Sequence, residues 1–115
     1  MHICGWLQVK LTLRKMRNDK LLNFTFIVEF RGGTYCTQVL AKDVYKSVLE
    51  WIKNIKINQS QIQYLGDKII EELKIESKEK DNRPILLNGL KNTWHTIYST
   101  KKGTFSINIV QTDIQ

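Results

Sequence analysis

The segment that most constrains the fold is residues 24–39, where apolar and polar residues alternate on both sides of a glycine pair. Alternation of this kind is typical of strands with one buried face, and a glycine pair between two such runs is typical of a β-hairpin. We predict a two-residue turn at Gly32-Gly33, because the tightest hairpin turns need positive φ at both central residues. This turn pairs Phe30 with Tyr35 and places Cys36 opposite Glu29.

Length and composition predict one domain. The chain has 115 residues, of which 42% are hydrophobic and 25% charged, which is enough for a single hydrophobic core. Its longest apolar runs are far shorter than the roughly 20 residues that span a bilayer, and the start Met1-His2-Ile3-Cys4 lacks a signal segment. We therefore expect a soluble cytoplasmic protein whose Cys4 and Cys36 stay reduced.

The first half of the chain predicts strands and then helices. Residues 7–13 alternate as a strand, and the polar run 14–20 reads as a hairpin loop before the strand that starts near Leu22. Helical spacing then predicts a helix over residues 42–55. A second helix is expected from the capping-box spacing at Ser60, with Gly66 inside it.

The second half predicts a connection and another hairpin. Residues 76–83 carry no apolar side chain and should be exposed, whereas Ile85-Leu86-Leu87 reads as a short buried segment. Residues 93–99 and 104–111 then alternate as two strands, joined by a loop that contains Gly103.

The predicted fold class is α+β. The element order β-β-β-α-α-β-β segregates strands from helices, which favours an antiparallel sheet of about five strands with both helices packed on one face. We expect residues 1–115 to form this single domain.

Residues with catalytic chemistry are few. His2, Cys4, Cys36 and His95 match no closed zinc spacing, so we predict no metal site and no cofactor. Cys36 and His95, with Glu29 or Asp113 as the acid, make the one conceivable nucleophile and base set. A carboxylate opposite Cys36 disfavours the thiolate, so we predict that Cys36 is a structural strand residue and that the protein is not an enzyme.

Aromatic and basic residues near the two glycine-containing hairpins are the candidate binding surface, because such mixtures are enriched at protein interfaces. The predicted binding residues are Arg31, Tyr35, His95, Tyr98, Lys101 and Lys102. Trp94 is expected in the core. The net charge of +7 and a dense basic run support nucleic-acid binding as an alternative. The residues of that alternative site are Arg14, Lys15, Arg17 and Lys20.

A family resemblance adds to these patterns. The stretch Phe30-Arg31-Gly32-Gly33-Thr34-Tyr35, the Trp51-bearing helix, Asn92-Thr93-Trp94 and the ending 107–112 resemble small uncharacterised bacterial proteins. Some proteins of this size and α+β layout are immunity proteins, which neutralise toxins encoded beside them. The resemblance implies a non-catalytic protein with a single partner. Immunity proteins for nucleases are often acidic, whereas this chain is basic, so the class of toxin stays open.

The leading hypothesis is therefore a small non-catalytic protein-binding module, with an immunity or inhibitor role as its most specific form. Its rivals are a basic domain that binds RNA or DNA and an enzyme that uses Cys36 and His95. The expected partner is another protein, and an open edge strand also leaves room for a homodimer.

Overall fold

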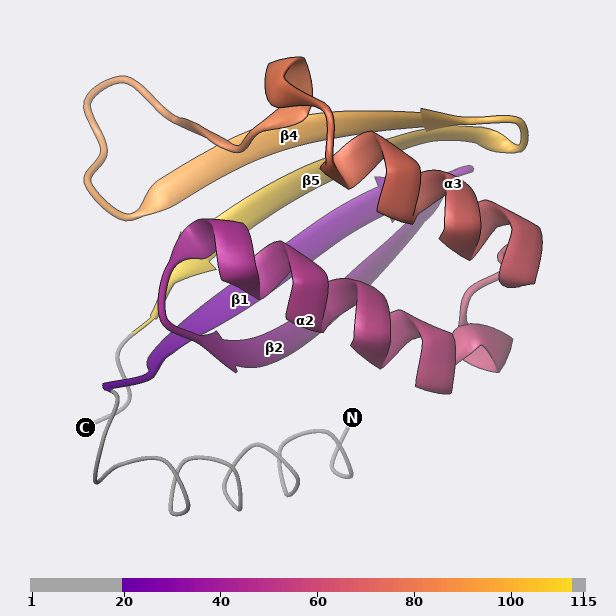
Figure 1. Cartoon of the computed structure of the whole chain (residues 1–115), viewed down its shortest axis with the longest axis horizontal. Coiled ribbons are helices and arrows are strands. Elements are labelled where there is room, and N and C mark those ends of the chain that lie inside the picture. The colour runs from indigo at the N-terminus through magenta and orange to yellow at the C-terminus, as the bar shows by residue number, and fades with distance from the viewer. Residues whose placement is uncertain (1–19, 113–115) are drawn as a thin grey trace.

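The structure is a computed structural model that describes residues 20–112. These residues form a five-stranded antiparallel sheet and two α-helices, which confirms the predicted α+β class (Figure 1). The elements are β1 (Leu22–Phe30), β2 (Gly33–Ala41), α2 (Val44–Ile57), the 3₁₀ turn η1 (Gln59–Gln61), α3 (Asp67–Ser77), the 3₁₀ turn η2 (Lys80–Asn82), β3 (Ile85–Leu86), β4 (Thr93–Thr100) and β5 (Gly103–Gln111).

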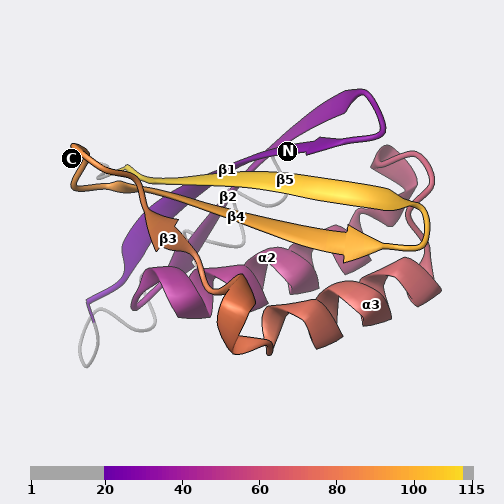
Figure 2. The same ribbon diagram turned by 90° about the horizontal axis from the view of Figure 1, so that it is seen from above.

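The sheet has the strand order β2-β1-β5-β4-β3, and α2 and α3 lie on the same face (Figure 2). The predicted strand at residues 7–13 lies outside the described residues, and so does most of the loop after it. Strand β1 is paired with β2 on one edge and with β5 on the other over residues 24–29. No edge of β1 is left there for the hairpin partner that the sequence predicted.

The first hairpin forms, but its turn lies one residue earlier than predicted. Phe30 pairs with Gly33, so the turn residues are Arg31 and Gly32, with φ of 49° and 81°. Both values are positive, as the predicted turn type requires. The register therefore differs by two residues from the predicted one, so every side chain keeps its predicted face and changes its cross-strand partner. Cys36 lies opposite Ile27 rather than Glu29, which corrects the prediction.

Helix α2 begins two residues later than predicted because Asp43 caps it. The carboxylate of Asp43 accepts a hydrogen bond of 2.8 Å from the backbone N–H of Lys46. Such a cap satisfies one of the free N–H groups of the first turn. The buried side chains of α2 follow helical spacing and point into the core. They are Val44, Ser47, Val48, Trp51, Ile52 and Ile55.

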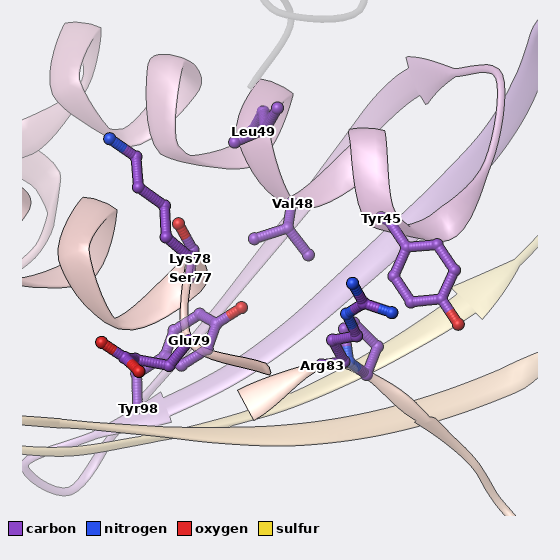
Figure 3. Close-up of a pocket in the computed structure, with 9 residues that line it drawn as sticks. Tyr45, Val48, Leu49, Ser77, Lys78, Glu79, Arg83 and Tyr98 are labelled. Atoms are coloured by element: carbon purple, nitrogen blue, oxygen red, sulfur yellow. The ribbon is translucent and has the colours of Figure 1, made fainter. Parts of the chain in front are cut away.

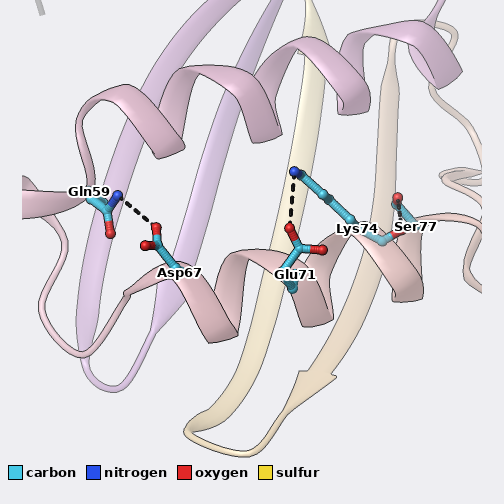
Figure 4. Close-up of polar contacts among 5 residues, drawn as sticks. All are labelled: Gln59, Asp67, Glu71, Lys74 and Ser77. Atoms are coloured by element: carbon cyan, nitrogen blue, oxygen red, sulfur yellow. Dashed lines mark hydrogen bonds and ion pairs between the residues drawn. The ribbon is translucent and has the colours of Figure 1, made fainter.

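Helix α3 begins at Asp67, so the prediction that the second helix starts at Ser60 is wrong. Residues 59–61 make only a 3₁₀ turn, and Gly66 is the N-cap of α3 with φ of 141°. Gly66 is thus the residue that ends the preceding loop rather than a weak point inside the helix. The side chain of Gln59 donates a hydrogen bond of 3.3 Å to Asp67, which ties the 3₁₀ turn to the start of α3 (Figure 4).

The segment Ile85-Leu86-Leu87 is exposed, which corrects the prediction of a buried segment. Ile85 and Leu86 form the edge strand β3, opposite His95 and Trp94 of β4. Their side chains are 66% and 47% exposed. Periodicity does not show whether so short an apolar run is buried. In the structure the run lies at the edge of the sheet, where few neighbouring side chains cover it.

The core lies between the sheet and the helices. Trp51 of α2 is 1% exposed, stacks on Phe26 with ring centroids 5.5 Å apart and meets the edge of Phe105 at 6.3 Å. Phe105, Ile107 and Ile109 of β5 are fully buried. Neither described helix is long and apolar enough to cross a membrane.

Candidate binding surfaces

The two hairpin turns predicted to form a binding surface lie side by side. The guanidinium of Arg31 donates a hydrogen bond of 2.7 Å to the backbone carbonyl of Lys102. The N–H of Lys101 donates a hydrogen bond of 2.9 Å to the carboxylate of Glu72 on α3. The same Arg31 guanidinium lies 4.0 Å from the ring centroid of Tyr64. Arg31 is therefore engaged within the protein, and it joins the turns to the loop before α3.

Of the other three predicted binding residues, Tyr98 and His95 do not join this surface. Tyr98 is 1% exposed and faces the helices, so its assignment to an exposed surface is wrong. Tyr35 is half-buried, packs against the core and lies beside Gly33, next to the first hairpin turn. His95 lies on the opposite face of the sheet, where its Nδ1 is 2.8 Å from the amide oxygen of Asn108. Trp94 packs against the core beside Phe24, as predicted.

Cys36 and His95 are too far apart to act as a nucleophile and its base. Cys36 pairs with Ile27, Ile27 with Asn108, and Asn108 with His95, so the two residues lie three strands apart in one row. Three strand spacings are about 14 Å, whereas a base must lie within about 3 Å of its nucleophile. Within residues 20–112, no group of three or more His, Cys, Asp or Glu side chains could hold a metal ion.

The sheet face opposite the helices offers little for nucleic-acid stacking. Along each strand, the residues of this face alternate with the residues that point into the core. Among the described residues of this face there is no Phe, Tyr or Trp. Proteins that bind single-stranded nucleic acid usually stack its bases on such rings. Of the predicted basic run, Lys20 is exposed just before β1, and Arg14, Lys15 and Arg17 lie outside the described residues. That alternative stays a prediction.

The structure shows a further surface, a groove between α2 and the C-terminal half of α3. One part is a hollow of about 340 Å³, here called the Tyr98 pocket, in which Tyr98 lies among residues of α2 and of the segment after α3 (Figure 3). Val48, Leu49 and Pro84 supply its apolar wall, and Arg83 lies beside them. Figure 3 shows the Tyr98 hydroxyl and the Arg83 guanidinium both pointing toward α2.

The Tyr98 hydroxyl is neutral. Burial raises the pKa of Tyr98 to about 12, against a smaller lowering by the Thr96 hydroxyl, and the charge of Glu76 raises the pKa further. The phenol therefore keeps its proton at physiological pH and can donate a hydrogen bond. Beside it, the Arg83 guanidinium lies 6.0 Å from the ring centroid of Tyr45, a side chain that is 52% exposed.

A second hollow of about 360 Å³ adjoins the Tyr98 pocket and shares Leu49, Ser77 and Lys78 with it. Ile52 adds an apolar side chain to its lining, and Lys74 is one of the lysines along it. In Figure 4 the ammonium of Lys74 lies between the two helices, 3.3 Å from a carboxylate oxygen of Glu71. We call the two adjoining hollows the helix groove.

The helix groove is basic. Its lining includes five cationic side chains and two carboxylates, an excess of three positive charges. The cations are Lys46, Lys53, Lys74, Lys78 and Arg83, and the carboxylates are Glu50 and Glu79. Lys53 pairs with Glu50 at 3.3 Å, but such exposed pairs contribute little and exchange readily for a new partner.

Sequence patterns alone pointed only weakly to this groove. Tyr45 and Leu49 lie one position after the buried residues Val44 and Val48, so they widen the apolar face of α2 beyond the core stripe. This wider apolar face was the one feature of the sequence that indicated a binding surface on α2. The wall formed by Arg83 and Pro84 depends on where the chain turns after α3, which no local pattern reveals.

Comparisons of the chain with models of protein families, with curated proteins and with solved structures gave no match. The resemblance to immunity proteins therefore stays a prediction.

Proposed function

We propose that this protein is a small non-catalytic binding module that holds one protein partner in its helix groove. The observation that carries the proposal is the continuity of the two hollows across Leu49, a side chain that is 50% exposed. An exposed apolar side chain in a concave surface with a polar rim is a common anchor point at protein interfaces.

A protein segment fits the groove better than a small molecule does. Each hollow is near the lower end of the range of about 300–1,000 Å³ for ligand pockets. The side chains of Tyr45 and Leu49 line the groove and are about half exposed, so a small ligand inside one hollow would leave much of their surface in water. A longer partner covers both hollows at once and removes this apolar surface from water.

An immunity or inhibitor role in the cytoplasm is the specific form of this proposal. The exposed, free thiol of Cys36 supports only the choice of compartment, because such a thiol suits reducing conditions. In such a role the module binds its partner tightly and changes no covalent bond.

The test is affinity capture from nuclease-treated lysate of the native host, read by mass spectrometry. It compares the wild-type protein with Leu49→Lys and with the matched control Ile97→Lys. Ile97 is 49% exposed, almost the same as Leu49, but lies on the opposite face of the sheet. We expect one protein in near-equal amount with the wild type and with Ile97→Lys, and its loss with Leu49→Lys.

The proposal fails if no protein is retained, or if a retained protein binds Leu49→Lys as well as it binds the wild type. A second copy of this chain as the only occupant, detected by light scattering, also contradicts it. Retention of nucleic acid before nuclease treatment, with nothing retained after it, favours the nucleic-acid alternative instead.

A further inference from the structure

We infer that the occupant of the helix groove is an acidic amphipathic segment of the partner protein, anchored by one carboxylate in the Tyr98 pocket. The inference deepens the proposed function and rests on it. It concerns the chemistry of the partner, which the proposed function leaves open.

The charge around the groove carries the first step. Lys46, Lys74 and Lys78 line the hollow between the helices. Lys74 is paired with Glu71 and Lys53 with Glu50, both at 3.3 Å, so Lys46 and Lys78 carry the excess of positive charge there. A basic segment would meet this excess of positive charge, whereas a segment with carboxylates on its flanks would meet complementary charge. Charge of this kind selects among partners and speeds association more than it adds affinity.

The apolar lining carries the second step. Leu49 and Ile52 contribute to the wall between the lysines, and Val48 and Pro84 continue the apolar lining into the Tyr98 pocket. A purely acidic segment would leave this surface uncovered. An amphipathic segment covers it with apolar side chains and keeps its carboxylates at the rim, where the lysine ammonium groups reach.

The Arg83 donor of the Tyr98 pocket carries the third step. The Arg83 guanidinium presents N–H groups in a planar fork that matches the two oxygens of a carboxylate. Tyr98 is 1% exposed and its hydroxyl interacts with Thr96, whereas Arg83 is exposed, so the guanidinium is the donor open to a ligand. In Figure 3 the carboxylate of Glu79 lies on the far side of Tyr98 from Arg83, so it does not occupy the space beside the guanidinium.

The test is a peptide-display selection against the full chain from an unbiased library, followed by affinity measurements on the enriched peptides. These peptides are the probes. They are titrated against the wild type, Leu49→Lys, Arg83→Glu, Lys78→Glu and the control Lys91→Glu, which makes the same charge change at an exposed position just before β4. Circular dichroism shows whether each variant keeps the fold.

We expect enriched peptides with net negative charge and apolar residues on one face. Their affinity should fall about tenfold in Arg83→Glu and in Lys78→Glu, and it should stay within about twofold in Lys91→Glu. Enriched peptides that need Leu49 but show no excess of Asp and Glu overturn the inference and leave the proposed function standing. Enriched peptides whose affinity is unchanged by Leu49→Lys contradict both.

Discussion

The guanidinium of Arg31 lies 4.0 Å from the ring centroid of Tyr64, and both residues have positive φ, at 49° and 66°. Left-handed backbone costs a residue with a side chain roughly 1–2 kcal/mol. Arg31 also binds the carbonyl of Lys102, so one side chain connects the β1–β2 turn, the β4–β5 turn and the loop before α3. These contacts offset the strain and fix one end of the sheet.

A double-mutant cycle tests this contact. Arg31→Ala and Tyr64→Ala should each lower the free energy of unfolding by about 1 kcal/mol. Together they should show a coupling energy of about 0.5–1 kcal/mol, because each removes the same cation–π contact. Urea unfolding of the four proteins measures the cycle. Strictly additive losses would mean that the two side chains do not stabilise each other.

The first turn should tolerate only residues that accept positive φ at position 32. Gly32 has φ of 81° and no atom within 4 Å of an added Cβ, so a substitution there is limited by backbone strain alone. Gly32→Val should cost about 1–2 kcal/mol, and Gly32→Asn less, because Asn visits this region more readily. Thermal unfolding compares the two variants. Equal melting temperatures would contradict this account of the turn.

Trp51 should be the most sensitive core residue on α2. It is 1% exposed and contacts the rings of Phe26 and Phe105, so Trp51→Ala should lower the free energy of unfolding by about 3–5 kcal/mol. Trp51→Phe keeps part of the ring contact and should cost clearly less. Urea unfolding followed by circular dichroism checks both variants. A loss below about 1 kcal/mol for Trp51→Ala would show that the site is not closely packed.

Tyr98 should make stability fall at high pH. Its pKa is about 12 in the folded protein and 10.0 by reference, so above pH 10 the unfolded chain loses this proton first. The contribution of Tyr98 is constant below pH 10, and the free energy of unfolding then falls by up to about 2–3 kcal/mol as the pH approaches 12. Stability is lost at alkaline pH because folding favours the neutral form of the Tyr98 hydroxyl.

The measurement is urea unfolding of the wild type and Tyr98→Phe at about pH 9 and about pH 11.5. Lysine residues also titrate in this range, so the difference between the two proteins isolates Tyr98. The wild type should lose more stability than Tyr98→Phe between the two pH values. An equal loss would show that the hydroxyl titrates as it does in water.

Local patterns predicted the fold class well because its elements have clear periods. The alternation around Phe26 and around Ile107 defined the core faces of two strands, and a shift of two residues in the register left those faces unchanged. The turn was misplaced because a glycine pair is the stronger local signal. Tertiary contacts of Arg31 with Tyr64 and Lys102 instead favour Arg31 in the left-handed position.

The candidate site was predicted less well because it depends on relations between distant segments. The exposed positions of Ile85 and Leu86 follow from the edge of the sheet, and the groove follows from the placement of α3 beside α2. Arg31 and Lys102 lie together because β1 and β5 are neighbouring antiparallel strands, an order that the sequence patterns left open. Tyr98 was assigned to the surface although its alternation with Thr96 and Trp94 also fits the core.

The measurement that tests the central claim most directly is calorimetric titration of the captured partner with the wild type, Leu49→Lys and Ile97→Lys. The two variants introduce the same side chain at equally exposed positions on opposite faces, at 50% and 49% exposure. The account predicts that Leu49→Lys weakens binding by at least about tenfold, while Ile97→Lys binds as the wild type does. Unchanged affinity for Leu49→Lys, or an equal loss in both variants, would contradict the helix groove as the binding surface.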